Sequence, residues 1–320
     1  MTHPHTAPTP SPAADTHRPA AAQGITLHSL TVGYRSGKAL RTLNRPATEH
    51  AACGTLTCLI GPNGAGKSTL LRTIAAFQPP TGGSACVGGR DVAAMSPTER
   101  AKAMAVVLTE RPSLAHTTVE ELVAMGRAPY TGFWGRPTEA DRAIVSRALA
   151  LVGIEPLAAR AVATLSDGER QKAMIAKALA QQTPVVLLDE PTAFLDYPSK
   201  VEAMLLLARL AHEEHKAVLL STHDLELALQ TADRLWLLNG PAANDGGKAT
   251  MPDSPATHDG GKAAPDSTTA SDGDATAHDG LSVLIGGTPR ELAADGSIAR
   301  FVERSHVAFD AEKLVIKVKG

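Results

Sequence analysis

The sequence predicts an α/β protein with a largely parallel sheet at its centre. Short apolar segments rich in Val, Leu and Ile recur along the chain, and segments with a helical pattern lie between them. Buried strands joined by helices are typical of a parallel sheet that is covered on both faces. One of these strands runs directly into a glycine-rich turn and a helix. The expected strands are Ile25–Val32, Thr55–Ile60, Ala105–Leu108, Val185–Leu188, Ala217–Leu220, Leu235–Leu238 and Leu314–Val318, with helices at Ser68–Ala76 and Arg290–Val302.

The composition excludes some functions before any motif is considered. The 320 residues carry a net charge of −2, so no basic field favours nucleic acid, and 3% aromatic residues leave little for base stacking. We therefore expect no nucleic-acid partner. No apolar run approaches the ~20 residues that cross a bilayer. If the protein drives transport, the pore belongs to another chain.

Changes in composition divide the chain into four parts. Residues 1–23 are rich in Pro, Thr and His without an apolar stretch, which predicts a disordered leader. The main domain spans residues 24–239. Residues 240–280 are dominated by Gly, Ala, Asp, Ser, Thr and Pro, and such a segment cannot bury enough apolar surface to fold, so we expect a disordered insertion. Residues 281–320 are expected to complete the main domain.

Within the main domain, residues from about 117 to 182 hold helical patterns with no strand between them. Thr118 and Glu121 have the spacing of a capping box at the start of a helix. Thr138 is placed to open a second helix, and a third helix is expected at Asp167–Ala180. We interpret this segment as a helical subdomain inserted into the α/β core.

The segment Gly61–Thr69 reads Gly-Pro-Asn-Gly-Ala-Gly-Lys-Ser-Thr and follows an expected strand. This is the phosphate-loop pattern, in which glycines let backbone N–H groups curl around a phosphate and a helix N-terminus adds its positive end. Lys67 is expected to reach the β- and γ-phosphates, and the Ser68 hydroxyl to bind Mg²⁺. The expected nucleotide-binding residues here are Gly61, Pro62, Asn63, Gly64, Ala65, Gly66, Lys67, Ser68 and Thr69.

A second motif, Val185-Val-Leu-Leu-Asp-Glu, places two carboxylates at the end of a buried strand. Ligands of open α/β sheets bind at the carboxyl ends of their strands. Asp189 is therefore placed to hold Mg²⁺, and Glu190 to orient a water molecule and accept its proton.

The segment Leu165-Ser-Asp-Gly-Glu-Arg-Gln resembles the signature motif of ABC ATPases, and residues 25–236 follow the motif order of that family. The resemblance implies a P-loop NTPase core of ABC type, with an antiparallel β subdomain and an inserted helical subdomain, that hydrolyses ATP with Mg²⁺. It also implies two copies packed head to tail. Ser166 and the Gly168 amide of one copy would then contact the γ-phosphate held by the phosphate loop of the other.

Three further positions resemble functional positions of the family. Tyr34 lies where members place an aromatic ring on adenine, although a tyrosine of the core is the alternative. Asp196 ends Ala-Phe-Leu-Asp, which resembles the loop that crosses the dimer interface. His223, in Ser-Thr-His-Asp, resembles the switch histidine that contacts the γ-phosphate.

Two positions depart from the family pattern. Glu110 stands where the family usually has a glutamine that touches Mg²⁺ and water. A carboxylate can still bind the metal, but it adds negative charge near the γ-phosphate. Asp167 replaces a common glycine of the signature, so we expect Asp167 and Glu169 to point away from the phosphate or to pair with Arg170 or Lys172.

Three segments indicate a class of transporter by resemblance: Glu121–Tyr130, Gly168–Gln171 and Gly287–Leu292 look like ATPase subunits of bacterial importers for iron–siderophore complexes, haem and cobalamin. The implied partners are a second copy, a multi-span permease and, indirectly, a periplasmic or lipoprotein substrate-binding protein. The implied location is peripheral, on the cytoplasmic face of the bacterial inner membrane. A groove of the helical subdomain would receive the coupling helix of the permease; a plain surface helix is the alternative reading of Glu121–Tyr130.

Other functions stay open at this point. An importer ATPase for another cargo, such as zinc or amino acids, shares the same motifs. A non-transport ABC ATPase and a nucleotide-binding regulator without catalysis are further alternatives. Glu110 favours the regulator, whereas the presence of Lys67, Asp189, Glu190 and His223 argues against it.

Overall fold

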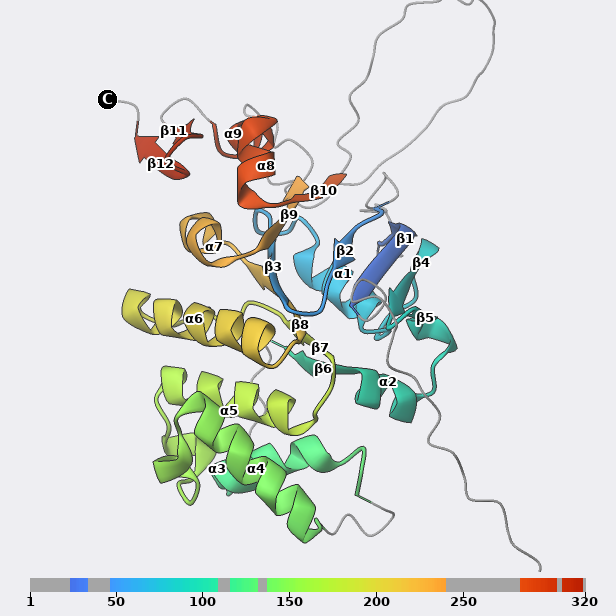
Figure 1. Ribbon diagram of the computed structural model, residues 1–320, viewed down its shortest axis with the longest axis vertical. Coiled ribbons are helices and arrows are strands. Elements are labelled where there is room, and N and C mark those ends of the chain that lie inside the picture. Colours follow the sequence, from blue (N-terminus) through green and yellow to red (C-terminus); the bar gives the residue numbers. More distant parts are fainter. Residues whose placement is uncertain are drawn as a thin grey trace, which may run out of the picture.

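The computed structural model describes residues 24–33, 47–108, 116–131, 137–239, 283–303 and 307–318. A six-stranded sheet forms the centre of the molecule (Figure 1). Four of its strand pairs are parallel, and only the outer pair of β10 with β9 is antiparallel among the described pairings. In spatial order the strands are β10 (Val283–Gly287), β9 (Arg234–Asn239), β3 (Thr55–Ile60), β8 (Ala217–Thr222), β7 (Val185–Leu188) and β6 (Met104–Val107).

Side chains alternate across this sheet and form two separate cores. On β3, Cys58 and Ile60 belong to one hydrophobic cluster, whereas Leu59 belongs to the other. This follows from the two-residue repeat of a strand. The first cluster packs against helices α5 (Asp167–Ala180), α6 (Tyr197–Glu213) and α7 (Leu225–Thr231), and the second against α1 (Lys67–Ile74). Both faces are therefore covered, as a parallel sheet requires.

A second, fully antiparallel sheet lies beside α1 (Figure 1). Its strands β2 (His50–Ala51), β1 (Ile25–Thr31), β4 (Gly82–Val87) and β5 (Arg90–Asp91) pair in that order. Leu27 and Ala85 are buried in the same cluster as α1, so this sheet closes the second core. The short elements η2 (Val92–Ala94) and α2 (Pro97–Ala103) lead from β5 back to β6.

The helices α3 (Val119–Ala124), α4 (Glu139–Val152) and α5 pack together below the main sheet in Figure 1. Capping boxes open all three, with Thr118, Thr138 and Ser166 as the N-cap residues. The structure confirms the expected caps at Thr118 and Thr138, and the expected bounds of α5. Capping boxes fix these helix starts because each satisfies two backbone N–H groups that a helix leaves free.

Arg127 joins the three helices through one buried guanidinium. It lies in the short turn η3 (Met125–Arg127) after α3, and its Nε donates to Asp141 Oδ1 at 2.8 Å. Its Nη1 donates to Ala180 O at 2.8 Å and to Gln182 Oε1 at 2.9 Å. The bond from Arg127, together with bonds from Thr138, lowers the pKa of Asp141 to about 2. This ion pair is satisfied on several sides, which a buried pair needs.

The C-terminal part departs from the predicted single helix Arg290–Val302. The structure has two helices, α8 (Pro289–Ala294) and α9 (Ser297–Val302), and Gly296 between them has φ 74°. A left-handed glycine ends one helix, and Asp295 Oδ1 accepts from Ser297 N to start the next. The expected strand Leu314–Val318 begins one residue later as β12 (Val315–Val318), because Leu314 has φ 52°. It pairs with β11 (Val307–Asp310).

The other expected strands and the first helix are confirmed with small shifts of their ends. The expected disordered segments, 1–23 and 240–280, lie outside the described residues. Within the described part of the chain, none of the helices combines the length and apolar character needed to cross a bilayer.

Candidate functional site

The phosphate-loop segment connects β3 to α1 at the carboxyl end of β3. Gly64 has φ 78° and Gly66 has φ 103°, a region that favours glycine. Position 61 requires glycine for a different reason, because a Cβ there would lie 2.8 Å from the carbonyl oxygen of Leu238 on β9. These glycines allow the tight turns of the loop and its close approach to β9, and α1 begins at the end of the loop. Such a loop can hold a phosphate through backbone N–H groups.

Lys67 is the first residue of α1, and its side chain is 5% exposed. Its ammonium donates to Gly61 O at 2.8 Å and to Pro62 O at 3.5 Å, so it folds back over the loop. The same nitrogen lies 3.3 Å from Glu190 Oε1. The structure therefore places a positive charge inside the loop that the sequence identifies as a phosphate site.

Asp189 follows β7 and meets two hydroxyl groups. Its Oδ1 accepts from Ser68 Oγ at 3.0 Å and from Ser221 Oγ at 2.8 Å. Asp189 is buried, and its bond to Ser68 brings together two of the side chains that the sequence analysis expects to hold Mg²⁺. A hydroxyl and a carboxylate are the oxygen ligands that Mg²⁺ takes together with substrate phosphates. The residues present thus fit a magnesium ion.

Glu190 lies between two basic side chains. One oxygen is 3.3 Å from Lys67 Nζ, and the other is 3.6 Å from His223 Nδ1. Its backbone has φ 48°, and its N–H donates to Ser221 Oγ at 2.9 Å. A partly exposed carboxylate next to Lys67 of the phosphate loop can accept a proton from water. The structure brings Glu190 and His223 together, and their catalytic roles stay predictions.

The signature segment forms the N-terminus of α5. Ser166 Oγ accepts from Glu169 N at 3.3 Å, and the Glu169 carboxylate accepts from Ser166 N at 2.8 Å. Hydrogen bonds to the Glu169 carboxylate, chiefly the one from the Ser166 backbone N–H, hold the pKa of Glu169 below its ordinary value. Glu169 also lies 3.5 Å from Arg160. Its carboxylate is thus occupied within its own helix end.

Of the two expected arrangements of the signature carboxylates, the pairing with Arg170 or Lys172 is present for Asp167, whereas the described ion pair of Glu169 is with another residue. Asp167 lies 3.8 Å from Arg170, as expected. Glu169 pairs with Arg160 instead of Arg170 or Lys172, and Lys172 lies 3.1 Å from Glu202. Arg160 comes from the loop before α5, a position that no local spacing connects to Glu169.

Gly168 and Asp196 lie where the N-termini of α5 and α6 meet. A Cβ on Gly168 would lie 3.7 Å from Ser199 Oγ, and Asp196 Oδ1 caps α6 by accepting from Ser199 N at 3.1 Å. A hollow of about 160 Å³ opens there. It is lined in part by Ser166, Gly168 and Ser199, and its described lining includes no residue of the phosphate loop. Within one chain, Ser166 and Gly168 therefore line a hollow to which no phosphate-loop residue contributes.

Tyr34 and Glu110 lie outside the described residues, so their expected roles remain predictions. Sequence reasoning missed Ser221. Its one local signal is its position two residues before His223, at the end of a buried strand. The bond to Asp189 depends on the register between β7 and β8, which the sequence does not display.

Comparison with known proteins agrees with this geometry. The family model described as ABC transporter matches residues 46–193. An uncharacterized ABC transporter ATP-binding protein of Methanocaldococcus jannaschii is 45% identical over 210 residues, covering 66% of this chain and 71% of that protein. The chain belongs to the ATP-binding proteins of ABC transporters. It is an ATPase of that family and has its α/β P-loop fold.

Further relatives carry more specific names. The probable siderophore transport system ATP-binding protein YusV of Bacillus subtilis is 40% identical over 212 residues, 66% of this chain and 75% of the relative. The cobalamin import ATP-binding protein BtuD of Halobacterium salinarum is 42% identical over 194 residues, 61% of this chain but 48% of the relative. Among solved structures, the dimeric ABC cassette MJ0796 matches with a TM-score of 0.59 at 26% identity, over 67% of this chain and 94% of that one.

Proposed function

We propose that this ABC ATPase is the energising subunit of an importer, and that two copies of it drive a permease which takes up an iron complex, haem or cobalamin. One observation carries the catalytic part: the Glu190 carboxylate lies between Lys67 and His223, beside Asp189. A regulator without catalysis has no need for a carboxylate in this place. The cargo rests on the names of the relatives.

The side chains divide the work as follows. Lys67 and the N–H groups of the loop bind the phosphates of ATP, and Ser68 and Asp189 hold Mg²⁺. When bound, Mg²⁺ neutralises charge on the phosphates. Glu190 orients the attacking water and accepts its proton, and His223 fixes the Glu190 carboxylate from its other side. Because Lys67 contacts both the loop and Glu190, it sets the distance between the phosphate and the base.

The proposal of two copies rests on the separation, within one copy, of the signature segment from the phosphate loop. Ser166 and Gly168 sit at a helix N-terminus, which favours a phosphate, yet they line a hollow that the phosphate loop does not reach. In the chain segment that contributes Leu195 to that hollow, Phe194 is 71% exposed and Tyr197 is 62% exposed. Exposed aromatic side chains are enriched at protein interfaces. We infer that the second copy packs here and presents its own phosphate loop to Ser166.

The catalytic proposal is tested with Glu190→Gln, which keeps the shape of the side chain but removes the base. ATP hydrolysis should fall by at least about a hundredfold, and the variant should form an ATP-dependent dimer that persists in sedimentation analysis. Glu213→Gln, an exposed position on α6, is the matched control and should behave as the wild type. Full hydrolysis by Glu190→Gln, or no change in its association with ATP, refutes the proposal.

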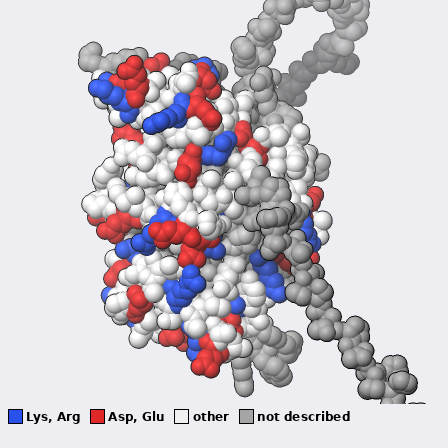
Figure 2. All heavy atoms as spheres, in the orientation of Figure 1, with Lys and Arg blue, Asp and Glu red and all other residues white. Residues whose placement is uncertain are grey.

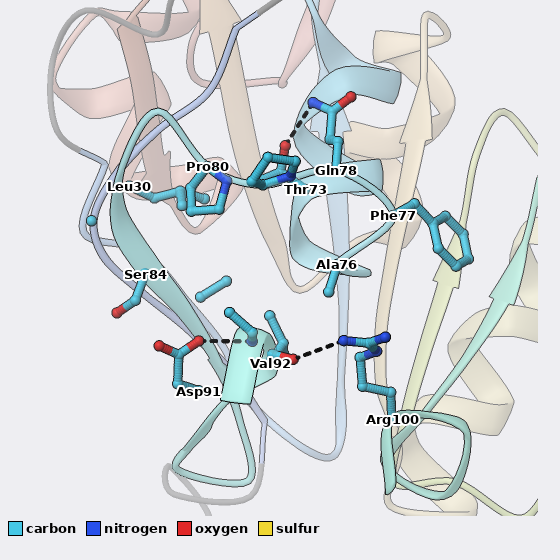
Figure 3. Close-up of a pocket in the computed structure, with 14 residues that line it drawn as sticks. Leu30, Thr73, Ala76, Phe77, Gln78, Pro80, Ser84, Asp91, Val92 and Arg100 are labelled. Atoms are coloured by element: carbon cyan, nitrogen blue, oxygen red, sulfur yellow. Dashed lines mark hydrogen bonds between the residues drawn. The ribbon is translucent and has the colours of Figure 1, made fainter. Parts of the chain in front are cut away.

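A permease needs a docking surface, and the surface on both sides of α2 offers one. On one side, a pocket of about 280 Å³ opens between α1, β4 and η2, with Leu30, Ala76 and Val92 among its walls (Figure 3). Arg100 of α2 donates to Val92 O at the edge of this pocket, and Phe77, which also lines the pocket, is 59% exposed.

On the other side of α2, Tyr130 and Met125 are partly exposed, and Lys102 of α2 lies 5.3 Å from the Tyr130 ring. We infer that the coupling helix of the permease lies across α2, and that this contact holds the protein at the membrane.

The charges on one face of the molecule bear on the question of a nucleic-acid partner. On the face drawn in Figure 2, Lys and Arg side chains are interspersed with Asp and Glu side chains. A phosphate backbone needs a continuous basic surface. This favours the transport function over an ABC ATPase that acts on nucleic acid.

The cargo is tested in vesicles that hold the protein with its permease and binding protein. An iron–siderophore complex, haem or cobalamin should stimulate ATP hydrolysis, whereas zinc and amino acids should not. If zinc or an amino acid stimulates hydrolysis instead, the cargo proposal is wrong and the transport function stands.

A further inference from the structure

Ser221 joins the two catalytic carboxylate residues through a single buried hydroxyl. It lies near the end of β8 and is 0% exposed. We propose that Ser221 is a positioning residue, which orients Asp189 for the metal and holds the backbone of Glu190 so that its side chain faces the γ-phosphate. This inference rests on the proposed hydrolysis of ATP.

The sheet itself brings Ser221 to this place. The strands β7 and β8 are parallel neighbours with Leu188 opposite Leu220, so the next residues, Asp189 and Ser221, lie side by side. Leu187 and Leu219 both face the core under α1. Asp189 and Ser221 come two residues later in the chain, so their side chains face the same side of the sheet as Leu187 and Leu219. On that side, Ser68 donates its hydroxyl proton to Asp189. The register therefore fixes the meeting of these three groups.

A serine hydroxyl has one proton to donate and lone pairs to accept with. The Ser221 hydroxyl uses both at once: it donates to Asp189 Oδ1 at 2.8 Å and accepts from Glu190 N at 2.9 Å. Each bond fixes the orientation that the other requires. Because the group is buried, water does not compete for either bond.

Ser68 donates to the same oxygen of Asp189, yet the two serines are not equivalent. Ser68 belongs to the phosphate loop, and its hydroxyl oxygen would be needed to bind Mg²⁺. Ser221 has no part in binding phosphate. Its bond can hold the Asp189 carboxylate both before and after the metal arrives, which is how groups behind a metal ligand act.

The second bond acts on Glu190. This residue has φ 48°, a left-handed conformation that has an energetic cost for a residue with a Cβ. The bond from Glu190 N to Ser221 Oγ offsets part of that cost and fixes where the Glu190 side chain leaves the backbone. From there the carboxylate reaches Lys67 on one side and His223 on the other. His223 comes two residues after Ser221. The contact between Glu190 and His223 therefore depends on this one segment for the position of both residues.

The test compares Ser221→Ala with Thr57→Val. Thr57 is a matched control, because its hydroxyl is also buried in the central sheet and has no hydrogen-bond partner among the described residues. Ser221→Ala should lower kcat for ATP hydrolysis by roughly tenfold or more, since it removes a hydrogen bond to a charged group. KM for ATP should change less than about twofold, and Thr57→Val should keep kcat within about twofold of the wild type.

A second readout does not depend on turnover. Binding of ATP is measured by equilibrium dialysis, once with EDTA and once across a Mg²⁺ titration. Ser221→Ala should bind ATP in EDTA as the wild type does, and should need about tenfold more Mg²⁺ to reach its full affinity. Ser221→Thr, which keeps the hydroxyl, should restore both kcat and the Mg²⁺ requirement.

The outcomes separate this inference from the proposed function. If the wild type hydrolyses ATP and Ser221→Ala matches it in kcat and in Mg²⁺ requirement, the inference is overturned and the ATPase stands. If the wild type itself hydrolyses no ATP, the proposed function fails. Should Ser221→Ala not fold, Ser221→Cys decides: it has nearly the same shape but a weaker donor, so a loss in kcat supports the inference and wild-type kcat overturns it.

Discussion

Gly126 offers a sharp test of how the helical region is packed. It lies in η3, between α3 and the buried Arg127, and the turn presses directly on the backbone of α5. A Cβ at Gly126 would lie 2.2 Å from Lys177 O, 3.1 Å from Ala180 Cβ and 3.3 Å from Gln181 N. Gly126→Ala therefore forces η3 away from α5.

The size of the effect follows from these distances. Ordinary contact begins near 3.4 Å, so the turn must move by about 1.2 Å from a helix backbone that cannot yield. Overpacking of this kind costs about 1–3 kcal/mol in the free energy of unfolding. At about 2–4 °C per kcal/mol, that lowers the midpoint of thermal unfolding by roughly 2–12 °C. The move also loosens the Arg127 bonds to Ala180 O and Gln182 Oε1.

Thermal unfolding followed by circular dichroism measures this change. Ala128→Ser is the matched control, because it adds one heavy atom to the exposed side of the same segment and should change the midpoint by less than 1 °C. ATP binding at the phosphate loop should be unaffected in both variants. A Gly126→Ala protein with the midpoint of the wild type would show that η3 does not press on α5 as described.

Two further predictions concern charge and association. The pKa of Asp141 is about 2 in the folded protein, below its ordinary value, so its carboxylate stabilises the fold above about pH 4 and this contribution is lost as the pH falls through 2. Asp141→Asn should unfold at a lower temperature than the wild type at pH 7, and the gap should narrow between pH 4 and pH 2; a constant gap contradicts this origin. Phe194→Ala in the Glu190→Gln protein should weaken the ATP-dependent dimer by roughly tenfold or more in sedimentation, because it removes an exposed aromatic group from the proposed interface, whereas Leu205→Ala, 56% exposed on α6, serves as the comparison. If Phe194→Ala weakens the dimer no more than Leu205→Ala does, Phe194 does not lie in the interface.

The sequence predicts those parts of the fold whose signals are local. The third helix, Asp167–Ala180, has the expected bounds because a capping box marks its start. The strand β4 was missed, since Gly-Gly-Ser-Ala-Cys-Val has no apolar run and its partners lie far away in the chain. The prediction of a single helix Arg290–Val302 is wrong because Gly296 adopts a left-handed conformation, which no local pattern in the sequence distinguishes from a helical glycine.

The residues of the candidate site divide in the same way, into those that a local sequence motif identifies and those that it does not. The phosphate loop, Asp189, Glu190 and His223 are recognisable because each belongs to a short contiguous motif. Ser221 and the pair of Arg160 with Glu169 are not, because one needs the register of two strands and the other the packing of a loop. Groups that hold a catalytic residue in place need no fixed spacing in the sequence, so they emerge from the structure.

The outer edge of the main sheet has a practical consequence. The chain leaves β9 at Asn239 and returns in β10 at Val283, and these two residues are direct partners in the antiparallel pairing. Whatever connects them starts and ends at nearly the same point. The entropy of closing such a connection grows only with the logarithm of its length. This corner of the molecule is therefore an insertion point, at which a reporter domain or an affinity tag could replace residues 240–282 while the sheet and the phosphate loop keep their geometry.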